Sequence, residues 1–286
     1  MYLRIIFLLS LFASNIAFAQ LCRVGGSDWL APIFQKAFSE QVASSGVVLD
    51  MHFRGSIPAK QDIQEGSIDV AIIASPKKED FGPEWKVVPF GFEVALVGVH
   101  PENPLSEISY EQLRGVFGMS ENVDRWTDLG LTGAWATRTI QPLLPPKNSG
   151  ATVLFLHDVL GRGDVRPTVR WVDEVGQLEQ RLNVDLGAIA VFPYTQKVEA
   201  VKMLAVAGKG KEGVSFNPTQ ENVFYGDYPL RLPLYLVFSS QASKSTQKVI
   251  QVLLGEGVAS RLAEGGVCPL PKKVRERTLL GLDIKS

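Results

Sequence analysis

Apolar and polar positions along the chain follow two periodicities, one typical of buried strands and the other of amphipathic helices. Short, almost continuous apolar runs predict strands covered on both faces, as in parallel sheets. These predicted strands are Leu21–Val24, Val47–Phe53, Ile68–Ala74, Val94–Val99, Ile140–Leu143, Thr168–Val172, Ala188–Phe192 and Leu234–Phe238. The helices predicted between or after them are Leu30–Val42, Pro58–Gly66, Tyr110–Phe117, Gly150–Leu160, Val175–Leu182, Ser245–Leu254 and Val258–Ala263. The order of strand, Gly/Ser turn, helix and strand predicts right-handed βαβ units and an α/β fold.

The bulk composition fits one large domain or two medium lobes. The chain has 286 residues, of which 45 % are hydrophobic, which is enough to bury a sizeable core. Gly and Pro cluster in Gly208–Pro218 and Gly226–Pro233, where we expect loops or crossings rather than a domain linker. The net charge of −1 gives no long-range attraction to nucleic acid, so we expect no nucleic-acid partner.

Residues 1–19 have the pattern of a secretory signal. Arg4 precedes the apolar run Ile5–Phe12, and Ala17-Phe18-Ala19 has the small-x-small pattern of a cleavage site. The apolar run is too short to span a bilayer. We therefore expect cleavage near Ala19 and a periplasmic or secreted protein.

Two cysteines, Cys22 and Cys268, lie near the ends of the exported chain. Chain ends often meet in a compact domain, and export leads to an oxidising compartment, so we predict a Cys22–Cys268 disulfide. The alternative is two small buried thiols that do not pair. Lipid attachment at Cys22 is disfavoured, because Leu21 stands where that processing selects Gly, Ala or Ser. The three histidines cluster neither with the cysteines nor with one another, so we expect no metal site.

Three serines, Ser27, Ser56 and Ser149, lie in turns at the end of a predicted strand or the start of a predicted helix. In open α/β sheets the ligand lies beyond the carboxyl ends of the strands, where helix N-termini present free N–H groups. Three such turns would bind one oxyanion together, through hydroxyl groups and backbone amides. The run Lys147–Gly150 adds a cation beside the third turn. The alternative for each serine is an ordinary helix N-cap, so the prediction depends on the joint pattern.

The sequence gives little support to catalysis. Ser149 and His157 are on one predicted helix, where eight residues correspond to a rise of about 12 Å, too far for a nucleophile and its base. A Gly-x-Ser-x-Gly motif, a phosphate loop and a dinucleotide fingerprint are absent from the sequence. We therefore expect no catalytic residues, no cofactor and no enzymatic activity.

Gly-Ser loops, strands and crossings follow one another along the chain in a fixed order. The segments are Gly26–Pro32, Gly55–Ser56, Lys60, Glu65–Ala71, Val99–Leu105, Tyr110–Phe117, Ser149–Gly150, Leu160–Gly161, Gly187–Ala190, Tyr228–Tyr235 and Pro269–Pro271. From about Arg23 to Leu280, this collinear set resembles the phosphate-binding periplasmic component of ABC transporters. The specificity of the resemblance lies in the order of the segments and not in any single motif.

The resemblance implies a two-lobed periplasmic-binding-protein fold. Each lobe would be a mixed or parallel sheet flanked by helices, and two crossover strands would join the lobes. Lobe 1 would comprise residues 20–92 and 225–286, and lobe 2 would comprise residues 93–224. Closure of the lobes on inorganic phosphate or a similar oxyanion would couple binding to recognition by a membrane permease. The resemblance further implies a monomer.

The resemblance and the serine turns together give a predicted ligand set. Its members are Ser27, Asp28, Gly55, Ser56, Ser75, Lys147, Ser149, Gly150 and Thr152. The chain departs from the family pattern at four positions. Asp28 and Trp29 follow the first Gly-Ser pair, where the family has a threonine or serine. Pro76 stands where the family has an aspartate, Ala151 replaces a threonine, and Pro145 or Pro146 replaces an arginine.

A buried dianion needs donors or a cation in place of water, so two compensations are put forward. In the first, Asp28 supplies the missing carboxylate and accepts the proton of hydrogen phosphate. In the second, one of four nearby cations replaces the arginine as counter-charge: Lys147, Lys77, Lys78 or Arg54.

The sequence thus predicts an exported solute-binding protein of an ABC transporter that binds phosphate or a related oxyanion between two lobes. Two alternatives keep the same fold. One is a ligand-free structural or interaction module. The other binds a small organic ligand in a cleft lined by Trp29, Trp85 or Trp126.

Overall fold

The structure, a computed structural model, describes residues 20–35, 46–119, 122–161, 163–195, 201–210 and 213–282. Its strands are β1 (Gln20–Gly26), β2 (Val47–Phe53), β3 (Val70–Ala74), β4 (Trp85–Val99), β5 (Glu107–Ser109), β6 (Gln141–Leu144), β7 (Arg170–Trp171), β8 (Ala188–Pro193), β9 (Lys202–Met203), β10 (Ala205–Ala207), β11 (Ser215–Phe216), β12 (Arg231–Ser239) and β13 (Val267–Pro269). Its α-helices include α2 (Ser56–Gln64), α3 (Tyr110–Phe117), α4 (Gly150–Asp158), α5 (Gly176–Val184), α6 (Gln220–Tyr225), α7 (Lys244–Leu253), α8 (Glu256–Glu264) and α9 (Lys272–Gly281). Short 3₁₀ turns are η1 (Asp28–Leu30), η2 (Trp126–Leu129) and η3 (Gly133–Trp135). The predicted signal sequence and residues 36–42 of the helix predicted over Leu30–Val42 lie outside the described residues.

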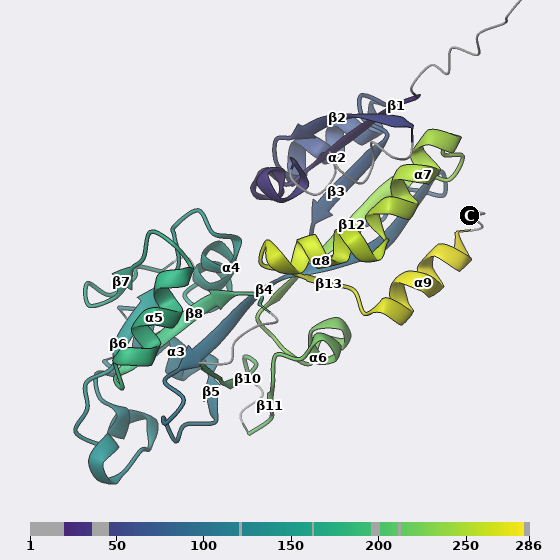
Figure 1. The fold of residues 1–286 in the computed structure, drawn as a ribbon. Helices are drawn as coiled ribbons and strands as arrows, with labels where there is room; N and C mark the ends of the chain where they lie inside the picture. The colour runs from purple at the N-terminus through teal and green to yellow at the C-terminus, as the bar shows by residue number, and fades with distance from the viewer. Residues whose placement is uncertain are drawn as a thin grey trace, which may run out of the picture.

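One continuous sheet connects the two halves of the molecule, with the strand order β2-β1-β3-β12-β4-β8-β6-β7. β1 is parallel to β2 and β3, whereas β12 is antiparallel to β3 and β4. β4 belongs to both halves, because it pairs with β12 as far as Val94 and with β8 from Ala95 onward. Figure 1 shows β4 running from one half to the other. The sheet is therefore mixed, which is one of the two forms that the family resemblance implies.

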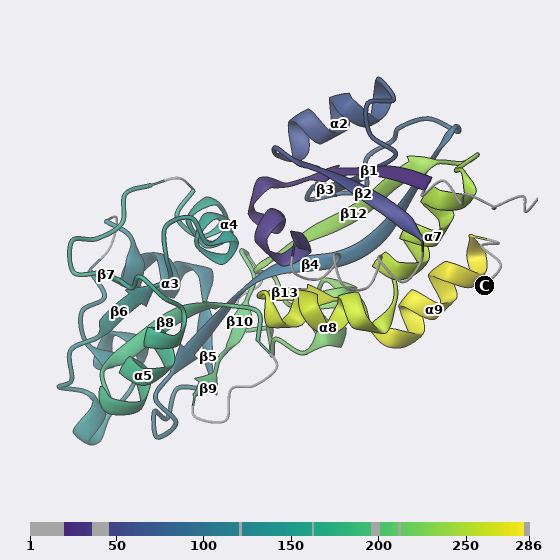
Figure 2. The same ribbon diagram turned by 45° about the horizontal axis from the view of Figure 1, so that its top comes forward.

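The first lobe packs helices on both faces of β1, β3 and β12. Ala59 and Ile63 of α2 pack on one face, against Ile73. Val249 of α7 and Leu262 of α8 belong to a separate core on the other face. Figure 2 shows α2 on the opposite side of the sheet from α7 and α8. This arrangement explains why β3 is a continuous apolar run, since both of its faces are covered.

The second lobe has a core of its own, built by α3, α4 and α5 on the β4, β8 and β6 part of the sheet. Its residues include Leu113 of α3, Phe155 of α4 and Leu182 of α5, which all have exposed fractions of 0 %. The predicted two-lobed α/β fold is confirmed. The boundaries of the lobes at residues 92/93 and 224/225 stay a prediction.

A second crossing runs beside β4. The Tyr228 hydroxyl donates to the carbonyl of Ala95 at 2.8 Å, and the amide of Ala95 donates to the carbonyl of Leu230 at 3.0 Å. Both bonds join the segment that leads into β12 to the part of β4 where its partner changes. The lobes are thus joined by two crossing segments that are hydrogen-bonded to each other.

The predicted disulfide is wrong. Cys22 on β1 and Cys268 on β13 are both free thiols, and they belong to different cores. The physical reason is that the two cysteines lie on strands with different neighbours, because β1 pairs with β2 and β3 whereas β13 pairs with β4 near the crossing. Burial raises the pKa of both thiols to about 12, so they behave as the small buried side chains of the alternative interpretation.

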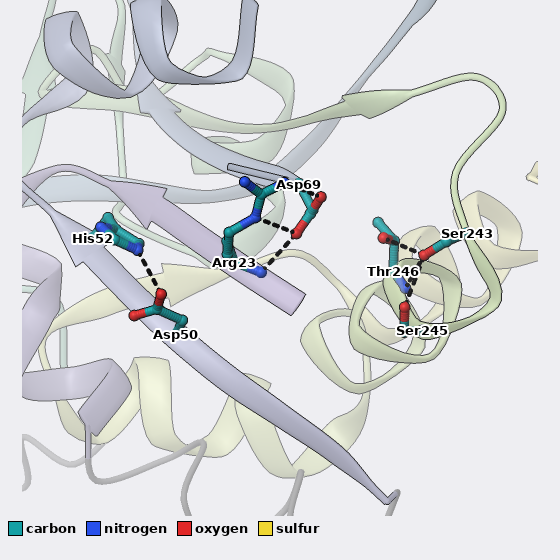
Figure 3. A network of polar contacts seen from close by, with 7 residues as sticks. All are labelled: Arg23, Asp50, His52, Asp69, Ser243, Ser245 and Thr246. Atoms are coloured by element: carbon teal, nitrogen blue, oxygen red, sulfur yellow. Dashed lines mark hydrogen bonds and ion pairs between the residues drawn. The ribbon is translucent and has the colours of Figure 1, made fainter. Parts of the chain in front are cut away.

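A polar network fastens β1 to the segment before β3, far from the crossing (Figure 3). Arg23 Nη2 donates to Asp69 Oδ1 at 2.9 Å, and the amide and Nε of Arg23 donate to Oδ2 of the same carboxylate. The amide of Asp69 donates back to the carbonyl of Arg23 at 2.8 Å. On α7, Ser243 caps the helix by accepting from the amide of Thr246. These contacts stabilise the β1–β3 part of the sheet and the start of α7 in lobe 1.

No helix in the described part of the chain is long and apolar enough to cross a membrane.

Candidate functional site

The turns after β1 and β2 bring two of the predicted serines together. Ser27 Oγ and Ser56 Oγ are 3.2 Å apart, and Ser56 Oγ also accepts a hydrogen bond from the amide of Ala74 at 3.0 Å. The amide of Gly55 donates to the carbonyl of Gly26, which ties the two turns to each other. Gly55 has a φ of 118°, which L side chains rarely adopt, so glycine is required here. The hydroxyl pair is therefore fixed by both turns.

The N-cap alternative does not hold for Ser27 or Ser149. Both occupy N-cap positions, yet neither side chain makes a capping hydrogen bond. Ser56 is the first residue of α2 and its cap position is Gly55. By contrast, Ser109 forms a full capping box with Gln112 at the start of α3, as a capping serine does. The hydroxyls of Ser27 and Ser149 are thus not used to close their helices.

The N-terminus of α4 is open. The first amide of this helix that donates to a carbonyl is that of Val153, which bonds Ser149 at 3.1 Å. The preceding amides belong to the free N–H groups that every helix start presents, and Ser149 does not satisfy them. Thr152 points away from this opening, because its Oγ1 donates to the carbonyls of Pro145 and Pro146. Thr152 therefore supports the loop and does not face a ligand.

A cavity of about 650 Å³ lies between the Ser27 turn, the N-terminus of α4 and the crossing strands. It is lined by residues of both lobes, namely Ser27, Asp28, Trp29, Ala74, Pro76, Glu93, Asn148, Gly150, Val153, Leu154, His157, Asp158, Arg231 and Leu232. Of the predicted ligand residues, Ser27, Asp28 and Gly150 line this cavity, and Ser56 adjoins it through its contact with Ser27. Trp29 also lines it, whereas Trp126 is fully buried in the second core.

Other predicted ligand residues have different surroundings. Ser75 is buried, and its side chain hydrogen-bonds to Glu79. Lys147 is exposed and its ammonium lies 5.3 Å from the ring centre of Trp171. Arg54 pairs with Asp62 at 2.7 Å. Lys77 and Lys78 are exposed and do not line the cavity. The predicted cations are therefore occupied elsewhere or point to solvent.

Three charged residues of the cavity were missed from the sequence: Asp158 on α4, and Glu93 and Arg231 on the crossing strands. Glu93 on β4 is only 5 % exposed, and burial raises its pKa to about 8. Arg231 at the start of β12 is half-buried, and desolvation lowers the pKa of its guanidinium, which lies over the ring of Phe92 at 5.0 Å. The sequence held a signal for Glu93, because it interrupts the apolar run Phe90–Val99. Burial of a carboxylate in a strand costs free energy of folding unless the group is hydrogen-bonded or paired.

Among the described residues, no group of three or more His, Cys, Asp or Glu side chains is placed to hold a metal ion. His157 Nδ1 and Asp158 Oδ1 are 2.8 Å apart. Because both residues belong to α4, this contact is local to the helix.

Comparison with known proteins decides the family. A family model for the PBP superfamily domain matches residues 17–256. The chain belongs to the PBP superfamily. It is 26 % identical over 279 residues to the phosphate-binding protein PstS of Pseudomonas aeruginosa, covering 91 % of this chain and 86 % of that protein.

Solved structures agree with this PBP superfamily fold. A possible phosphate binding protein from Planctomyces limnophilus has a TM-score of 0.74 at 21 % identity, over 94 % of this chain and 99 % of that one. An ABC-type phosphate transport receptor from Vibrio cholerae has a TM-score of 0.70 at 19 % identity, over 88 % of this chain and 100 % of that one. At these identities the likeness concerns the fold, and it supports the two-lobed architecture.

Proposed function

We propose that the chain is an exported solute-binding protein that binds hydrogen phosphate or a related oxyanion between its lobes and delivers it to an ABC-transporter permease. One observation carries the proposal: the Ser27–Ser56 hydroxyl pair of lobe 1 and the open N-terminus of α4 in lobe 2 border one cavity. Hydroxyls and free helix amides are the donors that an oxyanion needs. The similarity to PstS gives independent support.

The same arrangement favours a role in binding over a role in catalysis. A nucleophile needs a base within hydrogen-bond reach, and the hydroxyls of Ser27 and Ser56 contact each other. His157 of the cavity is paired with Asp158 on its own helix. The cavity therefore offers donors for binding and no described nucleophile–base pair.

Calorimetric titration with phosphate, sulfate and molybdate tests the proposal on the mature chain. We expect saturable phosphate binding and a melting temperature that rises with phosphate concentration. Replacing both hydroxyls, in Ser27→Ala with Ser56→Ala, should weaken phosphate binding at least about tenfold, since two donors are lost. The matched control is Ser240→Ala, an exposed turn serine outside the cavity. No binding of any oxyanion at high concentration would refute the proposal and favour the ligand-free module.

An organic oxyanion is the second candidate, and the lining of the cavity favours it. Trp29, Val153 and Leu154 give the cavity an apolar wall, and its volume of about 650 Å³ exceeds what one phosphate group fills. An alkyl phosphonate would place its charged head at the serine pair and its substituent on this wall. Tighter binding of phosphonates with longer alkyl groups than of phosphate would establish the organic ligand. Rejection of all substituted phosphonates would exclude it.

A further inference from the structure

Asp28 brings an unpaired carboxylate to the edge of the proposed oxyanion site. It follows Ser27 directly, begins η1 and lines the cavity. Its side chain has no ion-pair or hydrogen-bond partner among the residues that the structure describes. The family has a threonine or serine here, whose hydroxyl would donate to an oxyanion, whereas a carboxylate only accepts. Asp28 therefore repels a bare dianion bound at the serine pair.

The other charged groups of the cavity leave Asp28 without a counter-charge. The guanidinium of Arg231 stacks on an aromatic ring, and His157 is hydrogen-bonded to Asp158 on its own helix. Within the described part of the chain, neither Arg231 nor His157 forms an ion pair with Asp28. Glu93 is 5 % exposed and adds a further carboxyl group that lacks a partner among the described residues. The lining therefore has room for a positive charge that the ligand itself supplies.

Trp29, the next residue along the chain, adds an aromatic surface beside this carboxylate. Its side chain is half-buried and lines the same cavity. A carboxylate and an indole ring together recognise an alkylammonium group, through a charge-assisted hydrogen bond and a cation–π contact. Val153 and Leu154 of α4 line the cavity from lobe 2 and offer apolar contact to methylene groups. The cavity thus combines oxyanion donors, an apolar wall and acceptors for a cation.

We propose that the ligand is a short aminoalkyl phosphonate or phosphate ester. Its oxyanion binds at the serine pair and the start of α4, and its ammonium group binds at Asp28 and Trp29. The linker is short, because the Cα atoms of the neighbouring residues Ser27 and Asp28 are only about 3.8 Å apart. Asp28 then accepts from the ammonium group of the ligand and not from the proton of hydrogen phosphate. This inference rests on the proposed function and names the substrate class of the same cavity.

The test compares two ligands that differ in one group. Propylphosphonate and 2-aminoethylphosphonate have the same length, but one ends in a methyl group and the other in an ammonium group. The ratio of their affinities, measured calorimetrically at neutral pH, therefore reports the contribution of the positive charge. It is measured in the wild type, in Asp28→Asn and in the control Asp173→Asn, which removes the same charge from an exposed residue that does not line the cavity. Phosphate and sulfate are titrated in parallel, and thermal melts establish that each variant is folded.

We expect the wild type to prefer 2-aminoethylphosphonate over propylphosphonate at least about tenfold, because its ammonium group forms a charge-assisted hydrogen bond with Asp28. Asp28→Asn should abolish this preference. The same variant should bind phosphate and propylphosphonate as tightly as the wild type or more tightly, because a repulsive charge is removed. Asp173→Asn should keep the preference of the wild type. A partly unfolded variant would lose affinity for every ligand, so these opposite changes are specific to the proposed contact.

Three results would overturn the inference. If the wild type does not prefer 2-aminoethylphosphonate, or if Asp28→Asn keeps the preference, Asp28 does not bind an ammonium group, while binding of phosphate leaves the proposed function intact. If Asp28→Asn weakens the binding of all three phosphorus ligands alike, Asp28 contacts the oxyanion itself. If the wild type binds neither the phosphonates nor phosphate nor sulfate, the inference and the proposed function fail together. Should Asp28→Asn not fold, the preference of the wild type decides alone.

Discussion

Among single residues, buried Glu93 should lower the free energy of unfolding as the pH rises, an effect that is measurable without any ligand. Its pKa of about 8 in the folded state exceeds the unfolded value, so the folded chain keeps a proton that the unfolded chain releases. The contribution of this group is fully present below the unfolded pKa and is lost as the pH rises toward the folded pKa. The loss at pH 7 is on the order of 3 kcal/mol, for an unfolded pKa of about 4.3.

Glu93→Gln removes this titration, so its free energy of unfolding should fall less between about pH 5 and about pH 8 than that of the wild type. Urea unfolding at a series of pH values measures the difference. Parallel curves for the two proteins would mean that Glu93 is ionised in the folded state.

The Arg23–Asp69 contact in Figure 3 gives the opposite pH dependence. Burial alone would raise the pKa of Asp69, but hydrogen bonds from Arg23 outweigh it and hold the pKa below its usual value. The stabilisation is therefore present above the unfolded pKa and is lost as the pH falls through the folded pKa. Asp69→Ala should cost about 2 kcal/mol near neutral pH and less in acid, because charge-assisted bonds of a partly exposed pair are lost. Urea unfolding checks this against Asp173→Ala, an exposed residue; equal stability of the two variants would contradict it.

At the scale of elements, a substitution at the start of α4 should weaken phosphate binding with little effect on the free energy of unfolding. Gly150→Ala places a methyl group against the movable end of the Glu93 side chain, while alanine is the better helix former. We expect a change in the free energy of unfolding below about 1 kcal/mol, and at least about tenfold weaker phosphate binding. Gly176→Ala is a matched control, since Gly176 begins α5 and a methyl group there would meet nothing within 4 Å. Equal phosphate affinities of these two variants would exclude the start of α4 from the site.

The elements that local patterns define were predicted well. β2 and α3 have the predicted bounds. β4 was predicted only from Val94, although it begins at Trp85. Its first part is only partly buried and contains Pro89 and Gly91, which are typical of irregular strands, and the pairing register with β12 shifts there. That part of β4 is a strand because of pairing with β12 and β13, which a local pattern does not contain.

For the whole molecule, the state of the two cysteines tests whether β1 and β13 lie apart. Because Cys22 and Cys268 are buried free thiols in different cores, we expect two thiols to react in the denatured, unreduced protein. A reducing agent should leave the melting temperature unchanged. Mass spectrometry after alkylation in denaturant counts the thiols directly. A species lighter by two hydrogens that does not alkylate would restore the predicted disulfide.

The site was predictable in part, as far as local sequence patterns define it. Ser27, Ser56 and Gly150 follow from turn and helix signals, and they are found beside the cavity. The charges were not predictable, because Arg54 pairs with Asp62 and Lys147 lies over the ring of Trp171, and the sequence pattern shows neither contact. Glu93 enters the cavity through β4, whose path between the lobes depends on the whole sheet. Local sequence therefore specified the donors, and long-range topology determined the charges.

The placement of these donors on both lobes makes closure a testable consequence of binding. Ser27 and Ser56 belong to lobe 1, the amides of α4 belong to lobe 2, and the lobes are joined by β4 and the segment from Tyr228 into β12. A ligand that bonds both sides stabilises the closed arrangement in proportion to its contacts there. Small-angle X-ray scattering should therefore show a smaller radius of gyration at saturating phosphate. The Ser27→Ala, Ser56→Ala double variant at the same phosphate concentration should remain as open as the free protein. If calorimetry reports saturation while the scattering curve is unchanged, binding occurs without closure, and a permease would have no change of shape to recognise.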